Sequence, residues 1–188
     1  PMPKPIVDTV MPSLTRDVIA RDVVRGQYEG YRKEANVAPD SRTETFVALR
    51  FWVDNWRWQD VPFYLRTGKA LAQRTSQVVV QFRPVPHQSF PKAALPSIQP
   101  NRLIMHIQPD EGIRLVVLAK IPGPQMKLAP VDLRFAYQEA FCTAPSPEAY
   151  ETLLLDVMEN ESTLFMRADQ AEMAWEVVGP IQEAWAAS

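Results

Sequence analysis

Residues 43–137 contain a series of short segments with strand periodicity, and no segment between them has the periodicity of a helix. In residues 43–53 alternate side chains fall on opposite faces, which is the two-residue repeat of a β-strand. The same repeat predicts strands over residues 61–66, 76–83, 102–108, 112–120 and 131–137. Parallel strands require long crossover connections, usually helices, so strands that follow one another without helices predict an antiparallel sheet.

Helical patterns are confined to the two ends of the chain. We expect a short helix over residues 13–24, a second over 146–157, and a third that begins at Asp169. Gly179 and Pro180 should kink or break the third helix, because proline removes a backbone donor. A sheet joined to helices in this order predicts an α+β fold, with a large, mainly antiparallel sheet backed by helices.

Two of the predicted strands, 43–53 and 113–119, are apolar on both faces. Helices of the same chain can cover one face of such a sheet. The other face needs a further cover, which a partner subunit or another domain would supply.

Composition excludes several classes of protein. The 188 residues are 46% hydrophobic with a net charge of -2, so nothing indicates a nucleic-acid-binding surface. The single cysteine, Cys142, cannot form an internal disulfide, and zinc-ligand spacing is absent. No apolar run reaches the roughly 18 residues of a membrane span, and no signal peptide is recognisable. A reducing, cytoplasmic setting without membrane contact is therefore expected.

The motifs of common hydrolases are also missing. The sequence has no G-x-S-x-G, no H-E-x-x-H and no phosphate-binding glycine loop. Neither of its two histidines, His87 and His106, has an obvious carboxylate partner nearby in the sequence. We therefore interpret both histidines as structural or exposed rather than catalytic, and we expect no metal site in this chain.

The stretch VPFYLRTGKALAQR, residues 61–74, is the strongest candidate for a binding site. Gly68 lets the backbone turn where a strand ends, and Lys69 and Arg74 follow it. Cations that converge on a turn suit a phosphorylated or polyhydroxylated ligand, because charge-assisted hydrogen bonds are the strong ones. A solvated basic loop with no ligand is the alternative that spacing alone leaves open.

Residues 38–86 resemble the C-terminal domain of glucose-6-phosphate dehydrogenase, and the similarity extends from about residue 22 to about residue 180. The segments that carry the resemblance are RGQY (25–28), SRTETF (41–46), DNWRW (54–58), VPFYLRTGKAL (61–71), IQPDEGI (107–113), AYETLLLD (149–156) and FMRADQAEMAWEVVGPI (165–181).

The resemblance implies an activity and a domain organisation. The family oxidises glucose 6-phosphate to 6-phosphogluconolactone in the pentose phosphate pathway and transfers the hydride to NADP⁺. Its N-terminal half binds the dinucleotide, and its C-terminal sheet forms much of a dimer contact. We accordingly expect residues 1–24 to be a linker or the start of a domain, and 25–188 to be the C-terminal substrate-binding and dimerisation domain, with the N-terminal dinucleotide-binding domain absent.

By the same resemblance, Lys69, Arg74 and Gln108 are expected to contact glucose 6-phosphate. The family's catalytic histidine and its cofactor fingerprint lie N-terminal to everything in this sequence. The NADP is therefore expected to be bound mainly by that other region, and the chain by itself is expected not to reduce NADP⁺.

Some relatives hold a second, structural NADP⁺ in this domain, but the basic residues that anchor it are only partly matched. Arg66 corresponds to one of them and is a weak cofactor-binding candidate. Other positions carry Thr75, Val79 and His106, which cannot replace permanent cations, and Asp132 alone binds no phosphate. We expect no structural nucleotide here.

Two other functions remain open. The chain can be a non-catalytic assembly module, which dimerises through its sheet or pairs with a separate dehydrogenase subunit. It can also belong to a relative that uses a different hexose phosphate. The presence of Lys69, Arg74 and Gln108 favours substrate binding, since a pure scaffold needs none of them.

Overall fold

The structure is a computed structural model that describes residues 16–84, 99–141 and 149–187. The chain forms two compact units. The first contains residues up to 71 and from 152 onward, and the second contains residues 72–151. The expectations that concerned Ser13, His87, Cys142 and Ser146 lie outside the described residues.

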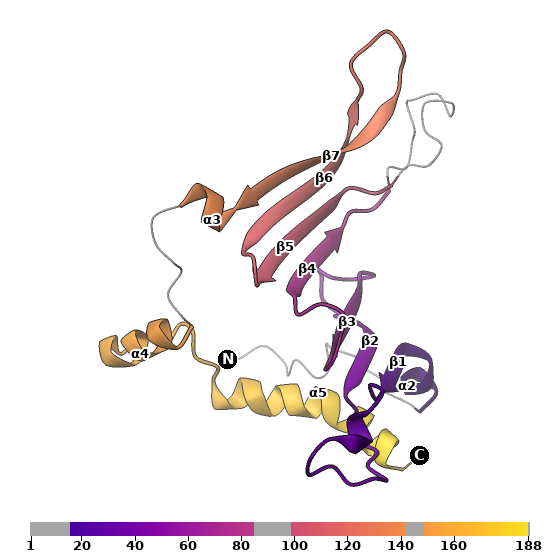
Figure 1. Cartoon of the computed structure of the whole chain (residues 1–188), viewed down its shortest axis with the longest axis vertical. Coiled ribbons are helices and arrows are strands. Elements are labelled where there is room, and N and C mark those ends of the chain that lie inside the picture. Colours follow the sequence, from indigo (N-terminus) through magenta and orange to yellow (C-terminus); the bar gives the residue numbers. More distant parts are fainter. Residues whose placement is uncertain (1–15, 85–98, 142–148, 188) are drawn as a thin grey trace. The chain divides into compact units, whose positions relative to one another are not determined.

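The first unit contains a three-stranded sheet and most of the helical residues (Figure 1). Its elements are α2 (Arg16–Asp22), β1 (Val23–Gly26), the 3-10 helix η1 (Tyr31–Lys33), β2 (Phe46–Trp52), β3 (Pro62–Gly68), the greater part of α4 (Ala149–Glu159), and α5 (Ala168–Ala186). The strands pair in the order β1-β2-β3, and both pairs are antiparallel.

The core of the first unit lies between this sheet and the helices α2 and α5. Its buried members are Ile19 of α2, Val23 of β1 and Ile181 of α5. Partly buried side chains of β2 and α5 pack around them: Val47, Leu49, Ala184 and Trp185. Since Val47 and Leu49 are two residues apart, they lie on the same face of β2, and this face is the one that the helices cover.

The second unit is a four-stranded antiparallel sheet in the order β4-β5-β6-β7. Its elements are β4 (Ser76–Gln81), β5 (Arg102–Gln108), β6 (Gly112–Lys120), β7 (Leu128–Ala136) and the one-turn helix α3 (Tyr137–Ala140). Strands β5 and β6 form the hairpin that the sequence predicts, with His106 opposite Gly112. Any side chain at Gly112 would meet the Phe135 carbonyl oxygen, 2.5 Å from where its Cβ would lie.

The two faces of the four-stranded sheet differ in polarity. One face is entirely apolar across two neighbouring rows of the sheet, which are Val78–Met105–Ile113–Phe135 and Val80–Leu103–Leu115–Leu133. The opposite face mixes apolar and charged side chains, as in the row Val79–Ile104–Arg114–Arg134.

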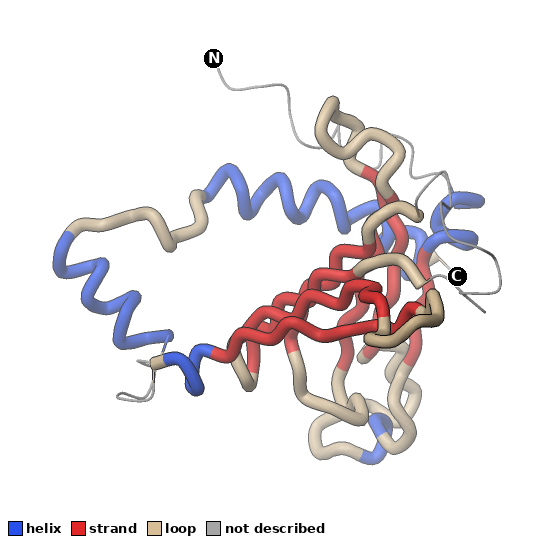
Figure 2. Tube along the Cα trace, turned by 90° about the horizontal axis from the view of Figure 1, so that it is seen from above, coloured by secondary structure: helices blue, strands red, loops and turns tan. Residues whose placement is uncertain are grey.

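The α+β class with antiparallel sheets is confirmed, although the seven strands of the described residues are divided between two sheets. Gly179 and Pro180 were expected to kink or break the third helix; they do not break it, because α5 is one helix that includes both residues. Figure 2 shows the helices in blue. Ile181, which follows the proline, is only 4% exposed. Its packing in the core stabilises the part of α5 that follows the proline, where the proline supplies no backbone N–H donor. No described helix combines the length and the apolar character that crossing a membrane requires.

A buried carboxylate joins α2 to β2. The side chain of Asp22 is fully buried and accepts hydrogen bonds from Arg21 Nη2 at 2.7 Å and from Arg50 Nε at 3.0 Å. The Arg50 guanidinium also lies 5.1 Å from the centre of the Trp52 ring. The hydrogen bond from Arg21 and the pairing with Arg50 lower the pKa of the Asp22 carboxyl against the opposing effect of burial.

This lowered pKa predicts how stability depends on pH. A carboxyl whose pKa is lower in the folded state stabilises the fold above its ordinary pKa of about 3.9, and this stabilisation is lost as the pH falls through the folded-state pKa. We expect Asp22→Asn to lower the melting temperature at pH 7, and the difference from the native chain to shrink below about pH 4. Thermal unfolding followed by circular dichroism measures both, with the exposed Asp40→Asn as control. A difference that stays constant from pH 7 to pH 2 would contradict the assignment.

Candidate functional site

The site that the sequence predicts begins where β3 ends, at Gly68. Gly68 lies opposite Phe46 of β2. A Cβ at this position would lie 2.9 Å from Phe46 Cδ2 and 3.1 Å from the Thr45 carbonyl oxygen. Glycine is therefore required here by the close approach of the two strands, because a side chain would push them apart.

Lys69 extends the pairing one residue beyond the end of β3. Its backbone N–H donates to the Thr45 carbonyl oxygen at 2.8 Å. The next residue, Ala70, has a left-handed backbone with φ of 52°, so the chain turns immediately after the lysine. The Lys69 side chain is exposed, and no acidic side chain in the described ranges forms an ion pair with its ammonium group. The backbone of Lys69 is therefore held in place, and its ammonium group is available to a ligand.

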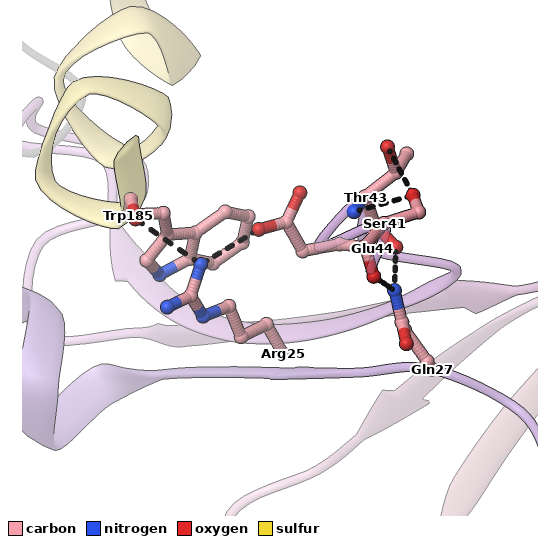
Figure 3. Close-up of polar contacts among 6 residues, drawn as sticks. All are labelled: Arg25, Gln27, Ser41, Thr43, Glu44 and Trp185. Carbon is pink, nitrogen blue, oxygen red and sulfur yellow. Dashed lines mark hydrogen bonds and ion pairs between the residues drawn. The ribbon is translucent and has the colours of Figure 1, made fainter. Parts of the chain in front are cut away.

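The segment that precedes β2 is held against the end of β1 by side-chain hydrogen bonds (Figure 3). The Gln27 amide nitrogen donates to the carbonyl oxygens of Ser41 at 2.9 Å and Thr43 at 2.8 Å. Ser41 and Thr43 are also joined by a hydrogen bond between their hydroxyl groups, at 3.3 Å. Residues 41–43 are thus tied to β1 by contacts that do not depend on strand pairing.

Arg25 connects the same segment to the C-terminal end of α5. Its Nη1 lies 2.8 Å from Glu44 Oε1 and donates to the Trp185 carbonyl oxygen at 3.3 Å (Figure 3). The guanidinium also lies 5.5 Å from the centre of the Trp185 ring. One side chain therefore joins the strand β1, the segment before β2 and the helix α5.

The second unit brings Arg74 and Gln108 to one end of its sheet. Gln108 is the last residue of β5 and pairs with Ser76, the first residue of β4. The Thr75 hydroxyl donates to the Gln108 carbonyl oxygen at 3.2 Å. Arg74 directly precedes this contact, and the side chains of Arg74 and Gln108 are both exposed.

Lys69 belongs to the first unit and the other two predicted ligands to the second, and four residues of the chain join Lys69 to Arg74. The structure therefore places Arg74 and Gln108 at the same end of one sheet, whereas Lys69 belongs to the other unit. Arg66, the weak cofactor-binding candidate, is exposed in β3 opposite Ala48. Its proposed role stays a prediction.

The second unit also contains a shallow groove of about 320 Å³. Its charged lining residues are Asp110, Glu111, Arg114, Asp132 and Arg134, and His106 also lines it. Both of these arginines are already paired with carboxylates, Arg114 with Asp132 at 2.5 Å and Arg134 with Glu139 at 3.5 Å. Within the described residues no cluster of histidine, cysteine or carboxylate side chains is suited to a metal ion.

Sequence reasoning missed the contribution of Thr45. This residue is only 9% exposed, and its backbone oxygen is the acceptor for Lys69. The sequence places it in the SRTETF segment, but it does not indicate which backbone group that segment would contact. Only the register of β2 against β3 reveals the contact.

Comparison with known proteins gives one consistent family. Residues 6–188 match the family model described as glucose-6-phosphate dehydrogenase, C-terminal domain. The chain is 50% identical over 182 residues to glucose-6-phosphate 1-dehydrogenase of Mycolicibacterium smegmatis, covering 92% of this chain and 36% of that protein. It is 43% identical over 191 residues to the Treponema pallidum enzyme, covering 96% of this chain and 37% of that protein.

Solved structures agree. A glucose-6-phosphate dehydrogenase in complex with its substrate glucose-6-phosphate matches with a TM-score of 0.81 and 31% identity, over 95% of this chain and 36% of that one. The enzyme from Mycobacterium avium matches with a TM-score of 0.76 and 36% identity, over the same shares of the two chains. The chain thus spans about a third of the length of the relatives it matches.

The close approach at Gly68 predicts opposite effects for two glycine substitutions. Gly68→Ala should destabilise the protein by about 1–3 kcal/mol, because its Cβ would press on Phe46 and on the Thr45 carbonyl oxygen. Gly179→Ala is the matched control, since nothing lies within 4 Å of its Cβ position. It should stabilise α5 by about 0.5–1 kcal/mol, because alanine is the better helix former. Urea unfolding measures both changes, and equal effects of the two substitutions would refute the packing argument.

Proposed function

Because this chain belongs to the glucose-6-phosphate dehydrogenase C-terminal domain family, we propose that it supplies the substrate-binding and self-associating part of an NADP-dependent glucose-6-phosphate dehydrogenase. The reaction converts D-glucose 6-phosphate and NADP⁺ into 6-phosphogluconolactone and NADPH. A solved relative is described as a complex with its substrate glucose-6-phosphate, which supports the choice of sugar.

The observation that carries this proposal is the exposed Lys69 ammonium beside a fixed backbone. The Thr45 carbonyl and the tight approach at Gly68 hold the lysine backbone. A phosphate oxygen is a strong acceptor for an ammonium group, and a held backbone leaves only the lysine side chain to be ordered when the ligand binds. In this proposal Lys69 holds oxygens of the sugar phosphate.

Arg74 and Gln108 have complementary roles in the same proposal. Arg74 adds a second permanent cation, and only four residues of the chain separate it from Lys69. Gln108 is exposed at the end of β5, and its amide can donate to one sugar hydroxyl and accept from another. In this proposal each of the three residues contacts the sugar phosphate and helps to orient it for oxidation at its C1 carbon.

The nucleotide has no matching site in the described residues. A dinucleotide fold holds the pyrophosphate at a glycine-rich turn between a strand and the helix that follows it. Here α2 precedes β1, and the helix that directly follows a strand, α3, has only four residues. We propose, as the family resemblance implies, that NADP binding and hydride transfer belong mainly to a region other than these residues, and we assign no catalytic step to them.

The apolar face of the four-stranded sheet supports self-association. Its side chains include Val78, Ile113, Leu133 and Phe135, each exposed by more than a third. An uncovered apolar face of this extent is unusual for a monomer in water. We propose that a second copy of the chain covers it and forms a homodimer.

A non-catalytic assembly module is the second candidate function, and the same apolar face favours it. Such a module needs the sheet and does not need the cations. Titration with glucose 6-phosphate separates the two functions, because a scaffold should bind no sugar phosphate.

Two neighbouring valines of β4 test the dimer. Val78 is 46% exposed on the apolar face, and Val79 is 47% exposed on the mixed face. Val78→Asp should shift the protein towards the monomer in sedimentation equilibrium, because a carboxylate would be buried without a partner. Val79→Asp should leave the association unchanged. If both variants dimerise like the native protein, the interface lies elsewhere.

The binding role is tested by removing the cations in the full-length protein. Lys69→Ala and Arg74→Ala should each weaken glucose 6-phosphate binding by about 10- to 100-fold, which corresponds to a charge-assisted hydrogen bond of about 1.5–3 kcal/mol. Isothermal titration calorimetry measures the affinity. Lys33→Ala is the matched control, because it also removes one exposed positive charge. If the native protein binds glucose 6-phosphate and both variants bind it with the same affinity, the proposed site is rejected.

A further inference from the structure

Thr45 is a junction between the ends of three strands. Its N–H donates to the Gly26 carbonyl oxygen at the end of β1, at 2.9 Å. Its hydroxyl oxygen accepts from the N–H of Tyr28 at 2.9 Å. Its carbonyl oxygen accepts from the N–H of Lys69 at 2.8 Å. Every polar group of Thr45 therefore has a backbone partner, and the three partners lie beyond or at the ends of β1 and β3.

We propose that Thr45 is a positioning residue for Lys69, and that it sets the affinity of the sugar-phosphate site without touching the ligand. This inference rests on the proposed function, in which Lys69 binds the phosphate. The Lys69 side chain can reach a fixed point only from a fixed backbone, and the Thr45 carbonyl is the group that holds the first residue after β3.

The threonine hydroxyl is the part of the junction that a substitution can remove. The backbone groups of Thr45 persist in any variant, but the acceptor for the Tyr28 N–H does not. At 9% exposure, water has little access to replace the lost acceptor. Tyr28, two residues beyond the end of β1, would then lose its contact with residue 45, and the carbonyl that holds Lys69 would lose one of the contacts that orient its residue.

The surrounding contacts show that the direction of this carbonyl is determined by more than strand pairing. Gln27 holds the segment 41–43, and Arg25 holds Glu44 next to Thr45 while also contacting α5 (Figure 3). These contacts hold the segment that leads into Thr45, the residue before β2. Gly68 has no side chain, which allows the Thr45 carbonyl to approach β3. These contacts belong to the first unit alone.

The test compares three substitutions in the full-length protein. Thr45→Val keeps the shape and removes the hydroxyl, and Thr45→Ser keeps the hydroxyl. Thr45→Val should raise the dissociation constant for glucose 6-phosphate by about 3- to 10-fold, and Thr45→Ser should restore most of the affinity. Val23→Ala removes a buried core side chain of the same unit and controls for lost stability, so the affinity should not change while the protein is folded.

A double-mutant cycle with Lys69→Ala shows whether the effect passes through the lysine. If Thr45 acts by positioning Lys69, Thr45→Val should have no further effect on affinity in the Lys69→Ala background. Amide hydrogen exchange at Lys69 should become faster in Thr45→Val and stay slow in Thr45→Ser. Equal losses of affinity in both backgrounds would mean a general structural effect and would overturn the inference.

The outcomes also separate this inference from the proposed function. If neither Lys69→Ala nor Arg74→Ala weakens the binding of glucose 6-phosphate, the proposed site fails and the inference fails with it. If Lys69→Ala alone has no effect, only the inference fails. If Lys69→Ala weakens binding but Thr45→Val does not, the proposed function stands and the positioning role is rejected.

Discussion

The antiparallel pairing of β2 with both of its neighbours is the constraint on which the rest of the first unit depends. This pairing puts Gly26, Phe46 and Gly68 in one row across the sheet. The residue before that row, Thr45, then meets the chain as it leaves β1 and as it leaves β3. A slip of one residue would move Val47 and Leu49 from the core to the opposite face, so packing on α2 and α5 holds the register. The position of Lys69 follows from that register.

The two units differ in how much of the apolar surface of their sheets is covered. In the first, α2 and α5 cover one face, and the buried carboxylate of Asp22 ties α2 to β2 through Arg50. In the second, α3 is a single turn, and several side chains of the apolar rows, among them Val78, Ile113 and Leu133, are exposed within the chain. The first unit therefore has its own small core, whereas the second has an apolar surface that is suited to a second protein surface. This contrast is the physical basis of the proposal that the second unit self-associates.

Much of the fold was predictable because alternation and helical repeats are local signals. The strands at 102–108 and 112–120 and the hairpin between them agree with the structure, since the two-residue repeat is unbroken there. Gly179 and Pro180, expected to kink or break the third helix, do not break α5, because burial of Ile181 outweighs a local preference against the helix. The sequence indicated Lys69, Arg74 and Gln108 as the candidate site, and their role in binding stays a prediction.

By itself, the sequence determined the antiparallel α+β class, the cations that follow β3, and membership of a family of sugar-phosphate dehydrogenases. Each of these three properties can be inferred from neighbouring residues or from short segments of the sequence. Only the tertiary structure decided that the strands form two sheets, that Gly68 is required by the approach of Phe46, and that Thr45 holds the backbone of Lys69. Those facts depend on which backbone groups meet across neighbouring strands, such as Phe46 and Gly68, and this pairing is set by the packing of the whole unit.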